Sequence, residues 1–310
     1  MRAIDKFSKE WHVDGMDRSP PHVTPGAALV ACHVAVALFG FAGVFGKWIA
    51  WDPVAIVLGR TTVAAIVLAL FVRYRLGAWR PPPWIAVPNG VILAVHWVAF
   101  FTAIEVSTVA IGLLGYASFP LFVPFLERAM LGLPVTRGKL TGAGLVALGL
   151  VLLVPEFTWA SHTVRGLAWG LLSGLTFALL TVRTRKLAPD RWSSEIALWQ
   201  NAIAALCVLP VVLWQGGLGG PVDAGAIGKM LLLGIFCTAV AHTLYAASLA
   251  RLPASTAAVC AALEPVYGIA LALVLLGEVP NARTLAGAAV IVVAALVATR
   301  RAHVVVTSTG

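Results

Sequence analysis

The sequence of 310 residues is too apolar for a water-soluble protein. Apolar residues make up 60% of it and charged residues 11%, and the mean hydropathy is +0.93. So few charged side chains cannot cover the two soluble domains that this length would otherwise allow. The net charge of +9 would suit a nucleic-acid-binding protein, but the basic residues fall in connections between apolar runs, so we expect no nucleic-acid partner. The composition predicts an integral membrane protein that is surrounded by the lipid bilayer.

The chain begins with a polar tail, residues 1–25, which lacks the apolar stretch and cleavage site of a signal peptide. Each transmembrane helix needs about 20 residues, so ten helices use about 200 and leave about 110 for tails and connections. Apolar runs predict these ten helices at residues 26–46, 54–72, 84–104, 107–127, 138–154, 164–182, 195–214, 228–248, 254–276 and 284–299. A short tail, residues 301–310, follows.

The basic residues predict the orientation in the membrane. With the N-terminus in the cytoplasm, most Lys and Arg fall on the cytoplasmic side, and the other side receives Lys47, Arg165, Lys229 and Arg283. This asymmetry follows the positive-inside rule. The predicted helix ends also carry an aromatic belt of Trp48, Trp51, Trp79, Trp84, Trp159, Trp169, Trp192 and Trp214. We expect a multi-pass protein of the plasma or inner membrane with both termini in the cytoplasm.

Cysteine and histidine spacing predicts no cofactor. The four cysteines, Cys32, Cys207, Cys237 and Cys260, lie inside apolar runs, and we interpret them as small buried residues without disulfides. No His-x-x-x-His or Glu-x-x-His spacing occurs within a predicted helix, so we expect no metal site. No Walker motif occurs either, so we expect no nucleotide as energy source.

An internal repeat divides the chain into two units, residues 26–155 and 156–300. Matching positions lie 145 residues apart and include Pro120 with Pro265, Gly132 with Gly277, Leu140 with Leu285, and Gly142 with Gly287. Each unit contains five predicted helices, so the second copy enters the membrane from the opposite side. Inverted repeats of this kind build alternating-access secondary transporters around one central site.

The second unit contains a moderately specific motif. It reads Ala262-Leu263-Glu264-Pro265, then Gly277-Glu278, then Leu285-Ala286-Gly287. Together with the repeat, over about residues 28–299, this resembles the EamA branch of the drug/metabolite transporter superfamily. The resemblance implies an all-α carrier of ten transmembrane helices, built from two inverted five-helix repeats around a central cavity, that exports small metabolites, often amino acids or drugs. Phe119 and Leu133 stand where the second unit has Glu264 and Glu278, which argues against a symmetric mechanism with two carboxylates.

Glu264 is the one acid of thirteen that we place near the middle of an apolar helix. A carboxylate at that depth costs at least about 2.5 kcal/mol, so it needs a polar cavity, a cation or a proton. We interpret Glu264 as a residue that exchanges a proton or binds a substrate ammonium group. The alternative is a neutral acid that holds a neighbouring helix by a hydrogen bond.

Further candidates lie on several predicted helices. His96 and His242 occupy matching positions in the repeats, and they would either bind substrate and relay protons or bond to backbone carbonyls. Trp97, Tyr116, Tyr245 and Tyr267 are expected to form an aromatic wall of the cavity, although such side chains also pack against helices or lipid. Arg60 is a second-rank candidate that could attract an anionic group, although we favour structural pairing or snorkelling. The other second-rank candidates are Lys47, for which we favour a solvated end charge, and Trp199 and Gln200, for which we favour bonds between helices.

These patterns predict a secondary transporter that exports small metabolites, foremost amino acids or drug-like amphipathic compounds, with protons as a possible coupling ion. The same fold could instead carry quaternary ammonium or sugar-type cargo. A membrane-embedded enzyme is the alternative from another class, but the sequence shows no nucleophile-base cluster, so we expect no catalytic residue. A passive channel ranks low because no selectivity-filter run occurs. These features leave the cargo, the direction of transport and the oligomeric state open.

Overall fold

The computed structural model describes residues 23–77, 84, 86–153, 158–189, 191–290 and 292–294. These residues form helices, and no strand occurs among them. The helices are α2 (Pro25–Trp48), α3 (Pro53–Leu76), α4 (Ala86–Val106), α5 (Val109–Tyr116), α6 (Phe119–Leu131), α7 (Arg137–Leu153), α8 (His162–Leu187), α9 (Ser193–Trp214), α10 (Ala224–Gly234), the π-helix η1 (Ile235–Val240), α11 (Ala241–Leu249), α12 (Ala254–Ala261) and α13 (Glu264–Leu276). A short apolar helix, Ala282–Ala294, follows them. The tails, Trp79 and the end of the last predicted helix lie outside the described residues.

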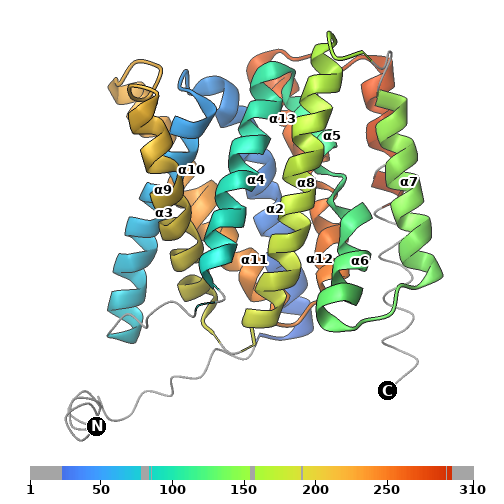
Figure 1. Ribbon diagram of the computed structural model, residues 1–310, viewed down its shortest axis with the longest axis horizontal. Coiled ribbons are helices and arrows are strands. Elements are labelled where there is room, and N and C mark those ends of the chain that lie inside the picture. The colour runs from blue at the N-terminus through green and yellow to red at the C-terminus, as the bar shows by residue number, and fades with distance from the viewer. Residues whose placement is uncertain are drawn as a thin grey trace, which may run out of the picture.

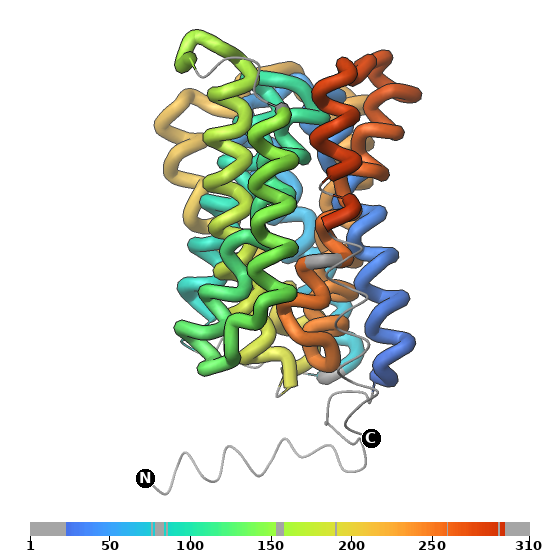
Figure 2. Tube along the Cα trace, turned by 90° about the vertical axis from the view of Figure 1, so that its right-hand side faces the viewer, coloured from blue at the N-terminus to red at the C-terminus, as the bar shows by residue number. Residues whose placement is uncertain are grey.

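The helices stand upright in one bundle, and successive segments cross its height in alternating directions (Figures 1 and 2). Within the described chain, seven helical segments are long and apolar enough to cross a membrane. They are Pro25–Trp48, Pro53–Arg75, Ala86–Val106, Val109–Leu131, His162–Leu187, Ser193–Trp214 and Ala224–Leu249. Glu264–Leu276 and Ala282–Ala294 are apolar but shorter. The protein is therefore an all-α integral membrane protein.

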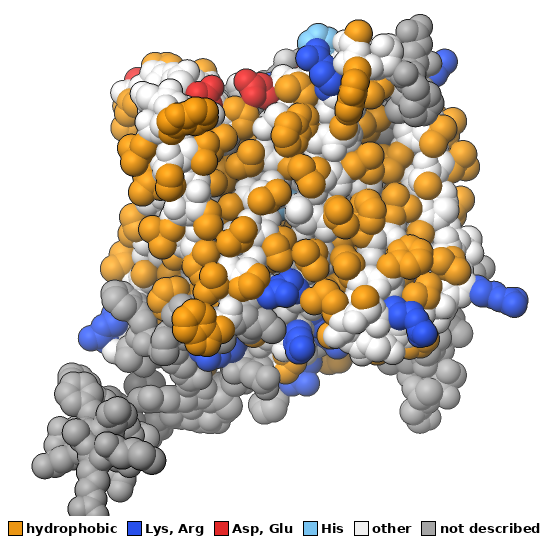
Figure 3. Space-filling view, in the orientation of Figure 1, with side chains coloured by type: hydrophobic (Ala, Val, Ile, Leu, Met, Phe, Trp, Pro, Cys, Tyr) orange, Lys and Arg blue, Asp and Glu red, His pale blue; other side chains and the backbone are white. Residues whose placement is uncertain are grey.

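The outer surface agrees with a bilayer environment. On the face seen in Figure 3, apolar side chains cover most of the height, acidic side chains lie at one end, and many Lys and Arg side chains gather toward the other. Trp84, Trp159 and Trp214 are 89%, 70% and 87% exposed and lie near helix ends.

The four cysteines are free thiols, and three of them, Cys32, Cys237 and Cys260, are buried. Cys207 is exposed, so the prediction that all four cysteines are buried is wrong at this position.

Two of the helices predicted from the sequence, 107–127 and 254–276, are interrupted near their middle. The first breaks between α5 and α6, and the second breaks between α12 and α13. Pro120 and Pro265 are the second residues of α6 and α13, where their missing N–H groups end the bonding of the preceding turn. Both following helices end at a glycine with left-handed φ, +70° at Gly132 and +68° at Gly277. The sequence repeat therefore has the same local structure in both copies.

Glycine permits the closest helix contacts. A Cβ atom at Gly170 of α8 would lie 2.7 Å from the Cα atom of Gly115 in α5, so a larger residue would collide with the backbone there. In the same way, a Cβ atom at Gly40 of α2 would lie 3.0 Å from the backbone nitrogen of Gly268 in α13. Close backbone approach at small residues is how membrane helices associate without a hydrophobic driving force.

Candidate functional site

A buried group of polar and aromatic side chains lies between the two halves of the chain. We call it the central cluster, and it consists of Arg60, His96, Trp97, Tyr116, His242, Tyr245 and Glu264. Four of its members are Arg, His or Glu residues, each from a different helix: Arg60 is 0% exposed, His96 1%, His242 6% and Glu264 1%. Such groups are rare inside membrane segments and mark functional sites by default.

Trp97 of α4 is the centre of the cluster. The guanidinium carbon of Arg60 lies 3.5 Å from the centroid of its ring, which is a close cation–π contact. The His242 ring stacks on Trp97 with centroids 5.8 Å apart and planes 21° apart. The His96 ring lies 4.6 Å away. The two histidines from matching repeat positions are thus brought together on one tryptophan.

Arg60 bonds to the helix opposite α3. Of the two interpretations favoured from the sequence, structural pairing fits this arrangement and snorkelling does not, because the side chain is fully buried. Its Nε donates to Thr238 Oγ1 at 2.9 Å, and its Nη2 donates to the carbonyl oxygen of Cys237 at 2.9 Å. Both acceptors belong to the π-helix η1, whose hydrogen-bond pattern is frequently found at functional sites. Nothing in the sequence signals this π-helix.

Four polar atoms in the cluster are buried without a hydrogen-bond partner. They are Arg60 Nη1, Trp97 Nε1, His242 Nε2 and Glu264 Oε2. Two other groups of the cluster bond to α8: His96 Nδ1 lies 3.0 Å from both Ser173 Oγ and the Ser173 carbonyl oxygen, and the Tyr245 hydroxyl lies 3.3 Å from Thr181 Oγ1. Unsatisfied buried groups are costly, so their convergence indicates a place for a ligand.

Glu264 is the first residue of α13, directly after the helix break, and Tyr116 is the last residue of α5, directly before the other break. The Tyr116 side chain interacts with the Glu264 carboxyl, and Arg60 acts on that carboxyl electrostatically. The two breaks therefore meet at the cluster. Tyr267 does not join it, because its side chain is 38% exposed on the outside of the bundle.

Two acids that the sequence placed near helix ends are also buried. Glu195 is 1% exposed and Glu127 is 0% exposed. Glu127 Oε2 accepts a hydrogen bond from Lys139 Nζ at 2.8 Å, and Glu127 Oε1 accepts one from the backbone N–H of Ser255 at 3.1 Å. Sequence reasoning placed Glu127 at a helix end and missed that it binds the start of α12 in the other half.

Glu278 makes the corresponding contact at the opposite end of the bundle. Its Oε2 accepts a hydrogen bond from the backbone N–H of Val109, the first residue of α5, at 3.0 Å. A carboxylate at a helix N-terminus is stabilised by the unpaired N–H groups and the helix dipole. Each half thus supplies a carboxylate that binds the first turn of a broken helix in the other half. We call these the Glu127 contact and the Glu278 contact.

The second-rank residues other than Arg60 lie around the cluster rather than in it. Lys47 Nζ donates to the carbonyl oxygens of Glu105, in the last turn of α4, and Ser107, just after it, at 3.4 and 3.2 Å. Gln200 Nε2 donates to Thr184 Oγ1 at 2.8 Å and so joins α9 to α8. Trp199 is half-buried and lines a small void.

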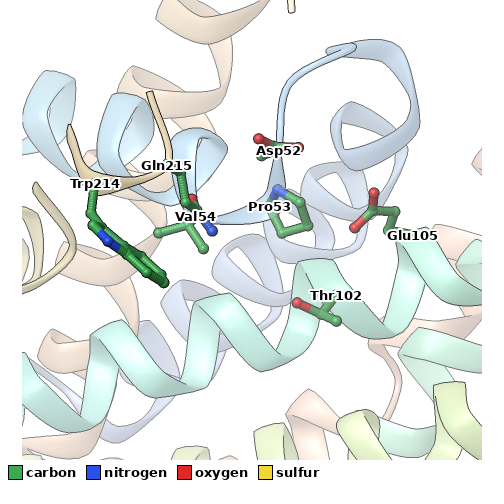
Figure 4. A pocket seen from close by; sticks show the side chains of 7 residues that line it. All are labelled: Asp52, Pro53, Val54, Thr102, Glu105, Trp214 and Gln215. Carbon is green, nitrogen blue, oxygen red and sulfur yellow. The ribbon is translucent and has the colours of Figure 1, made fainter. Parts of the chain in front are cut away.

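The cluster is closed to solvent in this conformation. The void beside His242, Tyr245, Thr181 and Gln200 has a volume of about 20 Å³, which is room for a water molecule and too small for a metabolite. A hollow of about 540 Å³ lies at one end of the bundle. It is lined by Asp52, Pro53, Val54, Thr102, Glu105, Trp214 and Gln215, and no member of the central cluster lines it (Figure 4). Within the described chain, no group of three or more His, Cys, Asp and Glu side chains could hold a metal ion.

Comparison with known proteins gives consistent matches. Residues 26–154 and 164–300 each match the EamA-like transporter family. The sequence is 27% identical to the pseudopaline exporter CntI of Pseudomonas aeruginosa, over 68% of this chain and 73% of the relative. It is 25% identical to a probable terminal-alkyne amino-acid exporter of Streptantibioticus cattleyicolor, over 90% of this chain and 91% of the relative. It is 26% identical to the uncharacterized transporter YwfM of Bacillus subtilis, over 67% of this chain and 70% of the relative. A crystal structure with 20% identity superposes with a TM-score of 0.70 over 89% of this chain and 98% of that one, which shows the same fold.

Proposed function

The chain belongs to the EamA-like transporter family, and from this premise we propose that it exports small amphipathic metabolites, foremost amino acids, by alternating access. The observation that carries the proposal is the central cluster, where both broken helices meet and four buried polar atoms lack partners. Transporters commonly bind their cargo where discontinuous helices meet between two repeats. The relatives named as exporters support the outward direction.

We further propose ten membrane passes in two inverted repeats. The first repeat would comprise α2, α3, α4, the broken pair α5 and α6, and α7. The second would comprise α8, α9, the continuous segment from α10 to α11, the broken pair α12 and α13, and the helix Ala282–Ala294. Packing supports this assignment, because the third segment of each repeat packs against the first segment of the other: α4 against α8, and α11 against α2. The gathering of basic side chains at one end (Figure 3) supports a cytoplasmic location for that end.

The Glu127 and Glu278 contacts are proposed as the two gates of the transport cycle. They lie at opposite ends of the broken helices, and each joins the two halves. Opening the cluster toward one side requires the loss of one contact while the other holds. The closed cluster with both contacts formed then corresponds to an occluded state between the two open states.

Proton coupling is proposed for Glu264. A buried carboxyl with one unbonded oxygen either carries a proton or binds a cationic group of the cargo, because an unpaired charge at this depth is unfavourable. Alternate occupation by proton and cargo ammonium would link export of the cargo to entry of a proton.

Efflux from proteoliposomes tests this function. Vesicles containing the protein are loaded with a mixture of amino acids, quaternary ammonium compounds, sugars and other common metabolites, and mass spectrometry follows the loss of each with and without a pH gradient. We expect saturable loss of a few amino acids, and we expect the effect of the gradient to disappear in Glu264→Gln. Glu105→Gln is the matched control, since Glu105 is exposed and lies outside the cluster. Loss of quaternary ammonium or sugar compounds instead would replace the cargo assignment, and an unchanged gradient response in Glu264→Gln would refute the coupling.

A further inference from the structure

The buried positive charge of Arg60 has no carboxylate partner. Its two bonded acceptors, a threonine hydroxyl and a backbone carbonyl, are both neutral, and within the described chain it forms no ion pair. A guanidinium at the centre of a membrane helix costs about 2.5 to 3.5 kcal/mol even on the mildest scales, and Arg60 lies about two turns inside α3. Neutral acceptors hold the side chain in place, but they leave its charge uncompensated.

The free polar atoms near Arg60 are mostly donors. Arg60 Nη1 and Trp97 Nε1 can only donate hydrogen bonds, and His242 Nε2 donates in one of its two neutral tautomers. Trp97 contacts the other two directly, because Arg60 lies over its ring at 3.5 Å and His242 stacks on it. A ligand that satisfies this side of the cluster must therefore present acceptor atoms and a negative charge.

Glu264 has the opposite chemistry. Its free Oε2 is an acceptor when the carboxyl is ionised, and it lies on the other broken helix from Tyr116. Arg60 and Glu264 influence one another electrostatically but do not form an ion pair. The cluster thus holds a guanidinium group and a carboxyl group that are not joined in an ion pair.

We infer that Arg60, Trp97 Nε1 and His242 form a carboxylate-binding subsite, so that the exported molecule carries a carboxylate as well as the amino group that would pair with Glu264. The inference rests on the proposed export function and specifies which atoms recognise the cargo. A carboxylate suits the site because a guanidinium presents planar, charge-assisted N–H donors. A zwitterion adds no net charge to the buried cluster, whereas a simple cation would leave Arg60 uncompensated.

Matched pairs of compounds test the subsite. Proteoliposomes are loaded with amino acids and the corresponding amino-acid amides, which keep the ammonium group and replace the carboxylate with a neutral group. We expect the wild type to export the acids at least about tenfold faster than the amides, as expected for loss of a charged hydrogen-bonded partner. Arg60→Gln should abolish this preference, and Arg60→Lys, which keeps the charge but loses the planar geometry, should retain only part of it. Arg75→Gln, at an exposed position of the same helix, should behave as wild type. Equal export of acids and amides by the wild type, or an unchanged preference in Arg60→Gln, would overturn the inference.

A binding measurement separates failure of the subsite from failure of the export function. Benzoate and benzamide differ only in the group that the subsite would bind, and thermal unfolding of the purified protein reports binding without transport. We expect benzoate to raise the unfolding temperature of the wild type and of Arg75→Gln, and to leave Arg60→Gln and Arg60→Lys unaffected or nearly so. Benzamide should have no effect on any of them. A folded Arg60 variant that benzoate still stabilises, or a wild type that benzoate does not stabilise, would reject the subsite even if export were observed.

Discussion

Replacing Glu278 with glutamine should favour the conformation that is open at the end where α5 begins. Glutamine keeps the shape and one acceptor oxygen but loses the charge that strengthens the bond from the Val109 N–H. Hydrogen bonds to charged groups contribute about 1.5 to 3 kcal/mol and neutral ones about 0.5 to 1.5, so the substitution removes about 1 kcal/mol. That difference shifts the ratio of open to closed forms by about fivefold.

Hydrogen–deuterium exchange measures this shift directly, because the donors to Glu278 and Glu127 are the backbone N–H groups of Val109 and Ser255. In Glu278→Gln, peptides containing Val109 should exchange faster, while peptides containing Ser255 should exchange no faster than in the wild type. The matched variant Glu127→Gln should show the reverse pattern, since its contact involves the Ser255 N–H. Faster exchange at both ends in either variant would indicate general loosening of the bundle, and it would refute the assignment of the two contacts as alternating gates.

Three further substitutions have predictable effects on thermal unfolding of the purified protein. Gly170→Ala should destabilise it by about 1 to 3 kcal/mol, because the added Cβ meets the backbone of α5, whereas Gly144→Ala, with open space around it, should not; equal effects would contradict the packing argument. Gly277→Ala should cost about 1 to 2 kcal/mol, because φ is +68° there, and an unchanged unfolding temperature would show that this turn relaxes freely. Lys139→Met should cost about 3 to 5 kcal/mol by leaving the buried Glu127 carboxylate without its cation, and the additional change Glu127→Gln should recover much of that loss; no recovery would show that Lys139 acts elsewhere.

Helix positions followed from the sequence. Apolar runs bounded by polar breaks are a strong signal for membrane helices, and the described helices lie where those runs do. The matched positions of His96 and His242 marked both as candidates, and His242 stacks on Trp97, the chain neighbour of His96. Apolar runs and internal repeats predict helix positions well because each such pattern includes many residues.

The surroundings of Arg60 and of the buried acids could not be predicted in the same way. Whether a long side chain reaches the membrane interface or points inward depends on which acceptors the neighbouring helix presents, and the carbonyl of Cys237 is accessible through backbone geometry rather than residue type. Likewise, Glu127 is buried because α12 begins beside it, more than a hundred residues further along the chain. Such contacts depend on how two distant segments of the chain pack together. The sequence of either segment alone does not predict them.

The π-helix between α10 and α11 also has a consequence for how the protein could have diverged. Its bonds span five residues rather than four, so it accommodates one residue more than a regular helix. Deletion of one residue from 235–240 would restore regular helical bonding and leave α10 and α11 in register, so His242 would keep its place on Trp97 while the acceptors of Arg60 in this segment would change. A single deletion at this place would therefore alter the surroundings of Arg60 without moving His242. Relatives with a regular helix here should provide Arg60 with another partner or replace it.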